Sequence, residues 1–242
     1  MTHPRFGAQR GLSPSTGRRL QFRLFGVADP AHYLHHRYLR RALDRLEITG
    51  PRRILDAGCG AGDHALYLAA RYPEADVLAI DLKPDRLPHL AEVAKALGLK
   101  NIGFEVGDLT TLSTEAEYDL IVCIDVLEHI PEQQRAAANL IRALRPGGLV
   151  FAHIPTIREV PVPFSRFLRA FHEWAEEEHT AVPLTFDRAV ALFSNCGAAI
   201  ADARRTFGFW TGEMATSLFA IPYRNTPINR LFQVLLVGPC RL

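Results

Sequence analysis

The sequence lacks several features that would assign it to particular protein classes. No acidic residue precedes Asp29. Apolar runs of about 18 residues are absent, so no membrane span is expected, and the amino-terminal segment has no apolar core of a secretion signal. The cysteines form no CxxC pair and have no zinc-ligand spacing, so they are expected to be reduced thiols in a cytoplasmic protein. They are Cys59, Cys123, Cys196 and Cys240.

The first 28 residues are basic, and the rest of the 242-residue chain is balanced in charge. Arginines accumulate there among Ser, Gly and Pro, as in a transit peptide, but Pro and Gly interrupt any amphipathic helix. We therefore expect residues 1–28 to be a flexible basic arm. A net charge of +2 and 48% hydrophobic residues indicate a globular protein without a general affinity for nucleic acid. Residues 29–242 are expected to form one domain.

From Arg52 onward, short apolar runs alternate with segments of helical periodicity, which is typical of βαβ units and a parallel sheet. One predicted helix ends at Leu97, where Gly98 caps it. The other predicted helices are residues 64–71 and 131–147. Strands are predicted at residues 53–56, 75–81, 101–108, 118–125, 149–155 and 199–207.

Four of these predicted strands end in aspartate. In an open α/β sheet, ligands bind beyond the carboxyl ends of the strands, so the four side chains are expected to meet in one crevice. Any one of them alone is explained as a helix cap or a turn residue, but four in register favour a ligand site. They are Asp56, Asp81, Asp108 and Asp125.

A glycine-rich turn, LDAGCGAGD, follows the first of these strands. Glycines allow a ligand to approach the backbone closely. The dinucleotide fingerprint needs a third glycine three residues after the second and a helix N-terminus free for pyrophosphate. Here Asp63 takes the positive end of the helix and repels phosphate, so a cationic adenosine cofactor fits better than NAD. Asp81 is expected to accept hydrogen bonds from both ribose hydroxyls.

Five segments together resemble the successive motifs of the class I S-adenosylmethionine-dependent methyltransferases. They are LDAGCGAG, AIDL, GDL, YDLIVCIDVLEHI and LRPGGLVF, which lie between Ile54 and Pro155. Within this family, the sequence resembles the bacterial small-molecule branch that includes the ubiquinone-biosynthesis O-methyltransferase. It implies a Rossmann-like, doubly wound, mostly parallel sheet of seven strands, with a helical cap at residues 29–48, a cofactor-binding core at 52–155, and an acceptor-site insertion, a sixth strand and a carboxyl-terminal segment within 156–242.

The resemblance also implies a set of residues that bind S-adenosyl-L-methionine, from which S-adenosyl-L-homocysteine is the product. The glycine-rich turn would line the methionine part, the next two motifs the ribose and the adenine, and the fourth motif the floor near the sulfonium. Tyr33 and Arg37 of the cap helix are expected either to close over the cofactor carboxylate or to be solvated. The implied residues are Asp56, Ala57, Gly58, Cys59, Gly60, Gly62, Asp81, Leu82, Asp108, Leu109, Asp125, Val126 and Arg37.

Three histidines are candidate general bases for an acceptor hydroxyl. His179 matches in position a histidine that relatives carry before the helix that precedes strand six. His129 lies near the mouth of the crevice, or else bonds a loop carbonyl, and His153 lies in strand five, where a core role is the alternative. No metal site is predicted, because His32 and His36, although four residues apart, have no evident third ligand.

The cap helix is expected to pack through Leu34, Tyr38, Leu39, Ala42, Leu43 and Leu46. The apolar segment after strand five is expected to cover a hydrophobic acceptor, to touch a membrane surface or to pack on the sheet edge. The predicted function is methylation of a small, hydrophobic acceptor, at oxygen rather than nitrogen or carbon. The alternatives are a non-catalytic cofactor-binding partner and a nucleic-acid methyltransferase; strand four lacks the Asn/Asp-Pro-Pro-aromatic motif of the latter, so no nucleic-acid partner is expected. The oligomeric state stays open.

Overall fold

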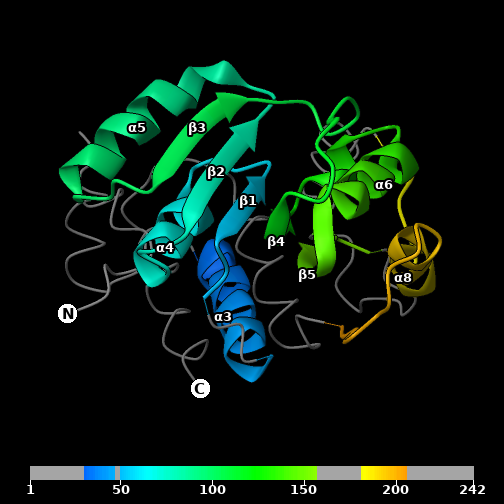
Figure 1. Ribbon diagram of the computed structural model, residues 1–242. Helices are drawn as coiled ribbons and strands as arrows, with labels where there is room; N and C mark the ends of the chain where they lie inside the picture. Colours follow the sequence, from blue (N-terminus) through cyan, green and yellow to red (C-terminus); the bar gives the residue numbers. More distant parts are fainter. Residues whose placement is uncertain (1–29, 47–49, 157–180, 206–242) are drawn as a thin grey trace.

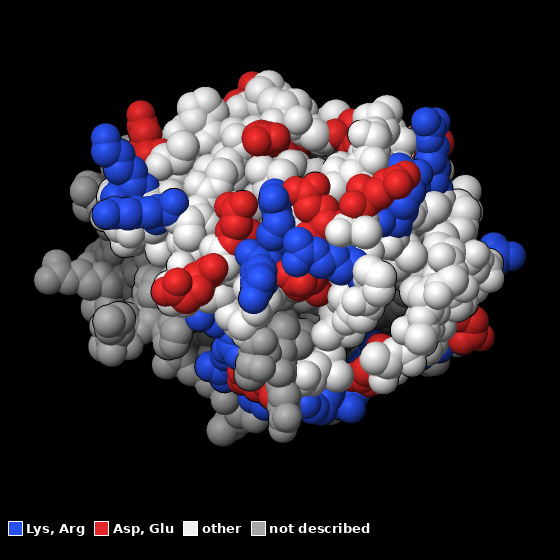
Figure 2. All heavy atoms as spheres, in the orientation of Figure 1, with Lys and Arg blue, Asp and Glu red and all other residues white. Residues whose placement is uncertain are grey.

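The computed structural model describes residues 30–46, 50–156 and 181–205, with the side chains of residues 30–34 left out. The predicted basic arm, most of the predicted insertion, His179 and the carboxyl-terminal segment lie outside the described residues. Within these ranges, no helix has the length and apolar character needed to cross a membrane. Figure 2 shows acidic and basic side chains intermingled on the face toward the viewer, in line with the small net charge.

Five parallel strands form one sheet in the order β3-β2-β1-β4-β5 (Figure 1). The strand order reverses between β1 and β4, and open α/β sheets bind their ligands beyond the carboxyl ends of the strands at such a reversal. The strands are β1 (Arg53–Ala57), β2 (Asp76–Asp81), β3 (Ile102–Val106), β4 (Tyr118–Ile124) and β5 (Leu144–His153). The doubly wound parallel fold that the sequence predicts is therefore confirmed, with five strands in the described part of the chain.

Helices cover both faces of the sheet, because alternate residues of each strand point to opposite sides. Leu55 and Ile121 face the core beneath α6 (Gln133–Ala143) and α8 (Phe186–Ser194). Ile54 and Leu120 face α3 (Pro30–Arg45) and α4 (Asp63–Arg71). The helix α5 (Leu87–Ala96) packs nearby, and the 3-10 helices η1 (Pro84–Arg86) and η2 (Leu127–His129) complete the described elements.

The cap helix is present as α3, but its buried face differs from the predicted one. Leu39 and Leu43 are fully buried as expected, whereas Leu46 is 40% exposed. Two histidines, His35 and His36, are buried instead. The buried row 35, 39 and 43 runs along one side of the helix at four-residue spacing, so α3 turns a histidine toward the sheet.

Two predicted elements differ from the structure. The helix α6 ends at Ala143 instead of Gly147, because Leu144 already pairs with Tyr118 at the start of β5; the ladder then shifts register and resumes at Leu149. The segment between Leu144 and Leu149 has the sequence of a helix end, because it contains Pro and Gly. The predicted sixth strand is absent from residues 199–205, all of which are exposed, so none of them packs into the core.

The amide of Asn101 ties the end of α4 to the sheet. Its Nδ2 group donates to the carbonyl oxygens of Ala69, Tyr72 and Ala75 at 3.1, 3.1 and 2.9 Å. We expect Asn101→Ala to lower the free energy of unfolding by about 1 to 3 kcal/mol, because these part-buried acceptors lose their donor. Urea denaturation measures the change. Lys100→Ala, at an exposed neighbouring position, is the control, and an equal change in both variants contradicts the prediction.

Candidate functional site

Three of the predicted aspartates lie where the strands of the central sheet end. Asp56 is in β1 and pairs in register with Ala79 of β2 and Val122 of β4. Asp81 is the last residue of β2, and Asp125 directly follows β4. The three therefore lie at the carboxyl ends of the strands where the strand order reverses, the place at which open α/β sheets bind ligands.

The glycine-rich turn connects β1 to α4 and needs glycine for two different reasons. Gly58 and Gly60 have φ angles of +84° and +51°. A Cβ atom on Gly58 would lie 2.4 Å from Cγ2 of Val126, whereas one on Gly60 would meet no atom within 4 Å. Gly58 is thus required because Val126 packs against it. Gly60 has open space beside it, into which a ligand can fit.

The carboxylate of Asp81 holds the turn in this conformation. Its Oδ2 accepts a hydrogen bond of 2.8 Å from the amide of Gly60, and its Oδ1 accepts one of 2.9 Å from the amide of Lys83. A carboxylate oxygen accepts more than one hydrogen bond, so both oxygens can also receive hydroxyl donors. Leu82, beside it, is 65% exposed.

Asp56 is a buried carboxyl group in an acidic surrounding. It is 4% exposed, and burial raises the pKa of its side chain to about 7, with further upward contributions from Asp81 and Asp63 and an opposing hydrogen bond from the Ala65 amide. Burial also raises the pKa of the Cys59 thiol, with Asp56 contributing in the same direction. Ala57 is fully buried in the core. This part of the crevice therefore favours a positively charged ligand.

Asp63 is the first residue of α4 and is buried at the positive end of that helix, as the sequence predicts. Gly62, with φ +75°, precedes it as the N-cap. Asp63 also acts on His36, whose ring packs edge-on against Tyr67 with centroids 4.3 Å apart. Burial lowers the pKa of His36 to about 4 despite the opposing effect of Asp63. His36 is consequently neutral at neutral pH. A phosphate group at this helix end would be repelled by the Asp63 carboxylate.

The region after β3 has a local structural role. Asp108 Oδ1 accepts hydrogen bonds of 2.8 Å from both the amide and the hydroxyl of Thr110. Leu109 is 4% exposed and packs in the core, while its carbonyl oxygen accepts a 2.8 Å bond from Asn139. The contact of Asp108 and Leu109 with an adenine stays a prediction.

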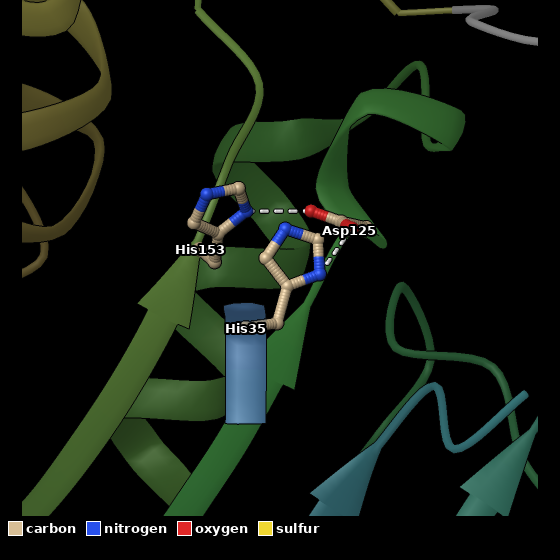
Figure 3. A group of neighbouring side chains, drawn as sticks. All are labelled: His35, Asp125 and His153. Carbon is tan, nitrogen blue, oxygen red and sulfur yellow. Dashed lines mark hydrogen bonds and ion pairs between the residues drawn. The ribbon is translucent and has the colours of Figure 1, made fainter. Parts of the chain in front are cut away.

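Two imidazoles meet the carboxylate of Asp125 at the end of β4 (Figure 3). Nδ1 of His153 lies 2.6 Å from Oδ1 of Asp125, and Nδ1 of His35 lies 3.2 Å from Oδ2. The ring centroids of His35 and His153 are 4.4 Å apart. Asp125 has φ +53°, a conformation that costs energy in a residue other than glycine and that clusters at functional sites.

Glu128 is near this cluster, and the remaining candidate residues are His129, Arg37 and His179. Glu128 is 6% exposed, and burial, followed by the charge of Asp125, raises its pKa to about 8. His129 of η2 has a 41% exposed side chain with Nε2 at 3.9 Å from Glu128. Arg37 is half-buried on α3. His179 is not among the described residues.

His35 is a site residue that was not predicted from the sequence. It shares the spacing of Leu39 and Leu43, which indicated only the packing face of the helix. The signal was available, because a histidine at a buried position of an otherwise apolar row needs a polar partner inside the protein. Its partner, Asp125, lies far along the chain, so the pairing itself required the fold.

Comparisons with known proteins agree with this geometry. Residues 54–148 match the family described as a methyltransferase domain. The chain is similar to the trans-aconitate 2-methyltransferase of Methylobacterium nodulans, with 35% identity over 49% of this chain and 44% of the relative. It is also similar to the ubiquinone biosynthesis O-methyltransferase of Xanthomonas oryzae pv. oryzae, with 32% identity over 58% of this chain and 57% of the relative. The chain thus spans about half the length of these curated relatives.

Among solved structures, the fold is similar to that of the [4+2]-cyclase SpnF. The TM-score is 0.63 at 20% identity, over 84% of this chain and 72% of that one. A phosphoethanolamine N-methyltransferase 2 of Haemonchus contortus in complex with S-adenosyl-L-methionine gives 0.60 at 16% identity, over 80% of this chain and 45% of that one. At these identities the likeness establishes the fold.

Proposed function

Because residues 54–148 match the family described as a methyltransferase domain, we propose that this chain is a class I S-adenosylmethionine-dependent methyltransferase that acts on a small molecule. One observation carries the proposal: three carboxyl groups, Asp56, Asp63 and Asp81, interact electrostatically around a glycine-rich turn. A crevice of this kind suits a cofactor that carries a sulfonium and an ammonium group. It does not suit the pyrophosphate of a dinucleotide.

The residues of the crevice fit this cofactor. Asp81, whose oxygens each accept one backbone hydrogen bond, is assigned to the ribose hydroxyls. The turn around Gly60, where a Cβ atom would meet only open space, is assigned to the methionine part. When bound, the cofactor supplies a methyl group activated by its sulfonium. The protein's task is then to align the acceptor for an in-line displacement, which is mainly a matter of position.

The acceptor is assigned to the end of the crevice formed by Asp125, His129 and His153. We favour an oxygen nucleophile on a hydrophobic molecule, because a hydroxyl group must lose its proton on methylation and the two imidazoles here can receive it. The curated relatives include an O-methyltransferase, and the solved structures include an N-methyltransferase. The choice of atom therefore rests on the imidazoles of this chain.

A cofactor-binding protein without methyl transfer is the second candidate. The observation that favours it is the similarity in fold to a [4+2]-cyclase, since the same architecture serves a different reaction there. The cofactor end of the crevice is equally compatible with both candidates, so only turnover separates them.

The experiment is an untargeted search for the methylated product. Cell extract is incubated with S-adenosylmethionine carrying an isotopically labelled methyl group, with and without the protein, and analysed by mass spectrometry. We expect one compound to gain the label only when the protein is present. Binding of S-adenosylhomocysteine without any labelled product supports the second candidate, and loss of both binding and label contradicts the first as well.

Cofactor binding is expected to release a proton from Asp56. Below pH 7 the buried carboxyl group is mostly protonated, since its pKa is about 7 in the free protein. A cation bound beside it lowers that pKa. Binding of S-adenosylhomocysteine at pH 6 should thus expel up to about one proton, and at pH 8.5 almost none. Calorimetry in two buffers of different ionisation enthalpy measures the release; Asp56→Asn should remove it, and release that persists in this variant contradicts the assignment.

A further inference from the structure

We propose that His35, Asp125 and His153 bind a divalent transition-metal ion, of which zinc is the best match. The case for the binding site rests on the geometry of these three residues alone. Its use, to hold and activate an oxygen atom of the acceptor, rests on the proposed methyl transfer. Neither the family assignment nor the comparisons describe such a site in this chain.

Three separate elements bring the ligand atoms together. His153 is the last residue of β5 and Asp125 follows β4, and the amide of Asp125 donates a 3.1 Å hydrogen bond to the carbonyl oxygen of His153. This backbone bond extends the parallel ladder by one rung and fixes the two residues side by side. The third residue, His35, comes from α3, which packs on the same sheet through Leu39 and Leu43. Figure 3 shows both rings directed at the Asp125 carboxylate.

The distances are close to those of a metal centre. One ligand atom from each residue lies within 4.8 Å of the other two. Zinc binds imidazole nitrogen and carboxylate oxygen at about 2.0 to 2.2 Å, so its ligand atoms lie about 3 to 3.5 Å from one another in a tetrahedral site. The His35 to Asp125 distance of 3.2 Å already matches. The Nδ1 atom of His153 lies 2.6 Å from the other carboxylate oxygen, Oδ1, whereas that of His35 faces Oδ2, so the Asp125 side chain has to turn slightly for one ion to contact all three residues.

The ligand set selects the class of ion. Two imidazoles and one carboxylate are typical of catalytic zinc sites and of the two-histidine, one-carboxylate sites of ferrous iron. Magnesium and calcium prefer oxygen ligands, so they fit less well. The Asp125 side chain keeps 34% of its surface exposed, and water or an acceptor oxygen can reach the cluster. A hydroxyl group bound to such a cation loses its proton more readily than a free one. With His153 holding the ion, His129 is the imidazole that takes this proton.

Charge at the site favours a cation. Asp125 lies close to a second carboxyl group, that of the buried Glu128. A divalent ion would offset the negative charge of this pair. The left-handed conformation of Asp125 points in the same direction, since strain of this kind is retained where a side chain must be aimed.

A hydrogen-bonded base without metal is the competing explanation. One carboxylate that orients one imidazole is sufficient for a general base. It gives the second imidazole no part in the chemistry, although the His35 side chain is only 7% exposed and presents its Nδ1 to the same carboxylate. Two imidazoles and one carboxylate at ligand distance match a cation site.

Cobalt(II) is the probe that tests the proposal, because its visible absorption reports the ligands. The untagged full chain is stripped of metal and titrated with cobalt chloride, and zinc competition is followed by calorimetry. We expect one equivalent to bind with bands of a low-symmetry N₂O site, and both His35→Ala and His153→Ala to weaken binding at least tenfold. His89→Ala, at an exposed histidine of α5, is the matched control and should bind as the wild type does.

The same samples are titrated with S-adenosylhomocysteine, which separates the two proposals and checks that each variant is folded. If the protein binds S-adenosylhomocysteine but not cobalt, the metal site is overturned and the proposed function is retained. If the protein binds cobalt but not S-adenosylhomocysteine, the proposed function is overturned instead. Cobalt binding that is unchanged in His35→Ala also overturns the metal site, as does an activity that depends on pH but not on added or removed metal.

Discussion

Asp81→Ala is expected to weaken the binding of S-adenosylhomocysteine at least about 100-fold. The variant loses two hydrogen bonds to the ribose, each charge-assisted and worth about 1.5 to 3 kcal/mol, and a combined loss of about 3 kcal/mol corresponds to roughly that factor. The carboxylate also holds the amides of Gly60 and Lys83, so part of the loss comes from a looser turn. Isothermal calorimetry measures the affinity, and circular dichroism verifies the fold.

Asp85→Ala is the control for this variant. Asp85 is an exposed acid in η1, four residues after Asp81, so its removal changes the net charge equally without touching the turn. We expect its affinity to stay within about twofold of the wild type, because exposed charges at a distance are screened. Equal losses in both variants would show that charge alone binds the cofactor and would contradict the assignment of the ribose to Asp81.

Two alanine substitutions in the glycine-rich turn are expected to have opposite profiles. Gly58→Ala should lower the free energy of unfolding by about 2 to 4 kcal/mol, because the left-handed backbone and the clash with Val126 add together. Gly60→Ala should cost only about 1 kcal/mol, since its methyl group meets no atom. That methyl group enters the space assigned to the cofactor. Gly60→Ala should therefore weaken the binding of S-adenosylhomocysteine strongly although it lowers the free energy of unfolding only slightly.

Urea denaturation and calorimetry on the two variants distinguish these effects. The pair is matched, because both positions have positive φ and receive the same added atom. Equal stability losses would mean that Val126 gives way to the new Cβ atom. Undiminished cofactor affinity in Gly60→Ala would mean that the ligand does not pass over this part of the turn.

The sequence predicted the central sheet well because its strands are buried on both faces. Continuous apolar runs bounded by turns defined β1, β2 and β4 to within one residue at each end. The cap at Gly98 is also confirmed, with φ +74°. The start of β5 was not predictable from local pattern, because Leu144 belongs to a strand only through its pairing with Tyr118. Proline and glycine between Leu144 and Leu149 conceal that pairing.

The cofactor end of the site was more accessible to sequence reasoning than the acceptor end. Asp56 and Asp81 follow from a rule about where strands end, and that rule needs no knowledge of side-chain packing. The cluster at Asp125 depends on how α3 is rotated on the sheet. The predicted face included Leu46, which is exposed, and left out His35, which is buried. A rotation of this size is set by tertiary contacts and not by the helix alone.

The contact between Gly58 and Val126 has a mechanical consequence. Val126 directly follows Asp125, and its side chain fills the position that a Cβ atom on Gly58 would occupy. The glycine-rich turn assigned to the cofactor therefore packs directly against the residue that follows Asp125, the carboxylate assigned to the acceptor. A shift of either one requires a shift of the other. A donor and an acceptor held on such a support keep their separation while the surrounding surface moves, which is the condition that an in-line transfer demands.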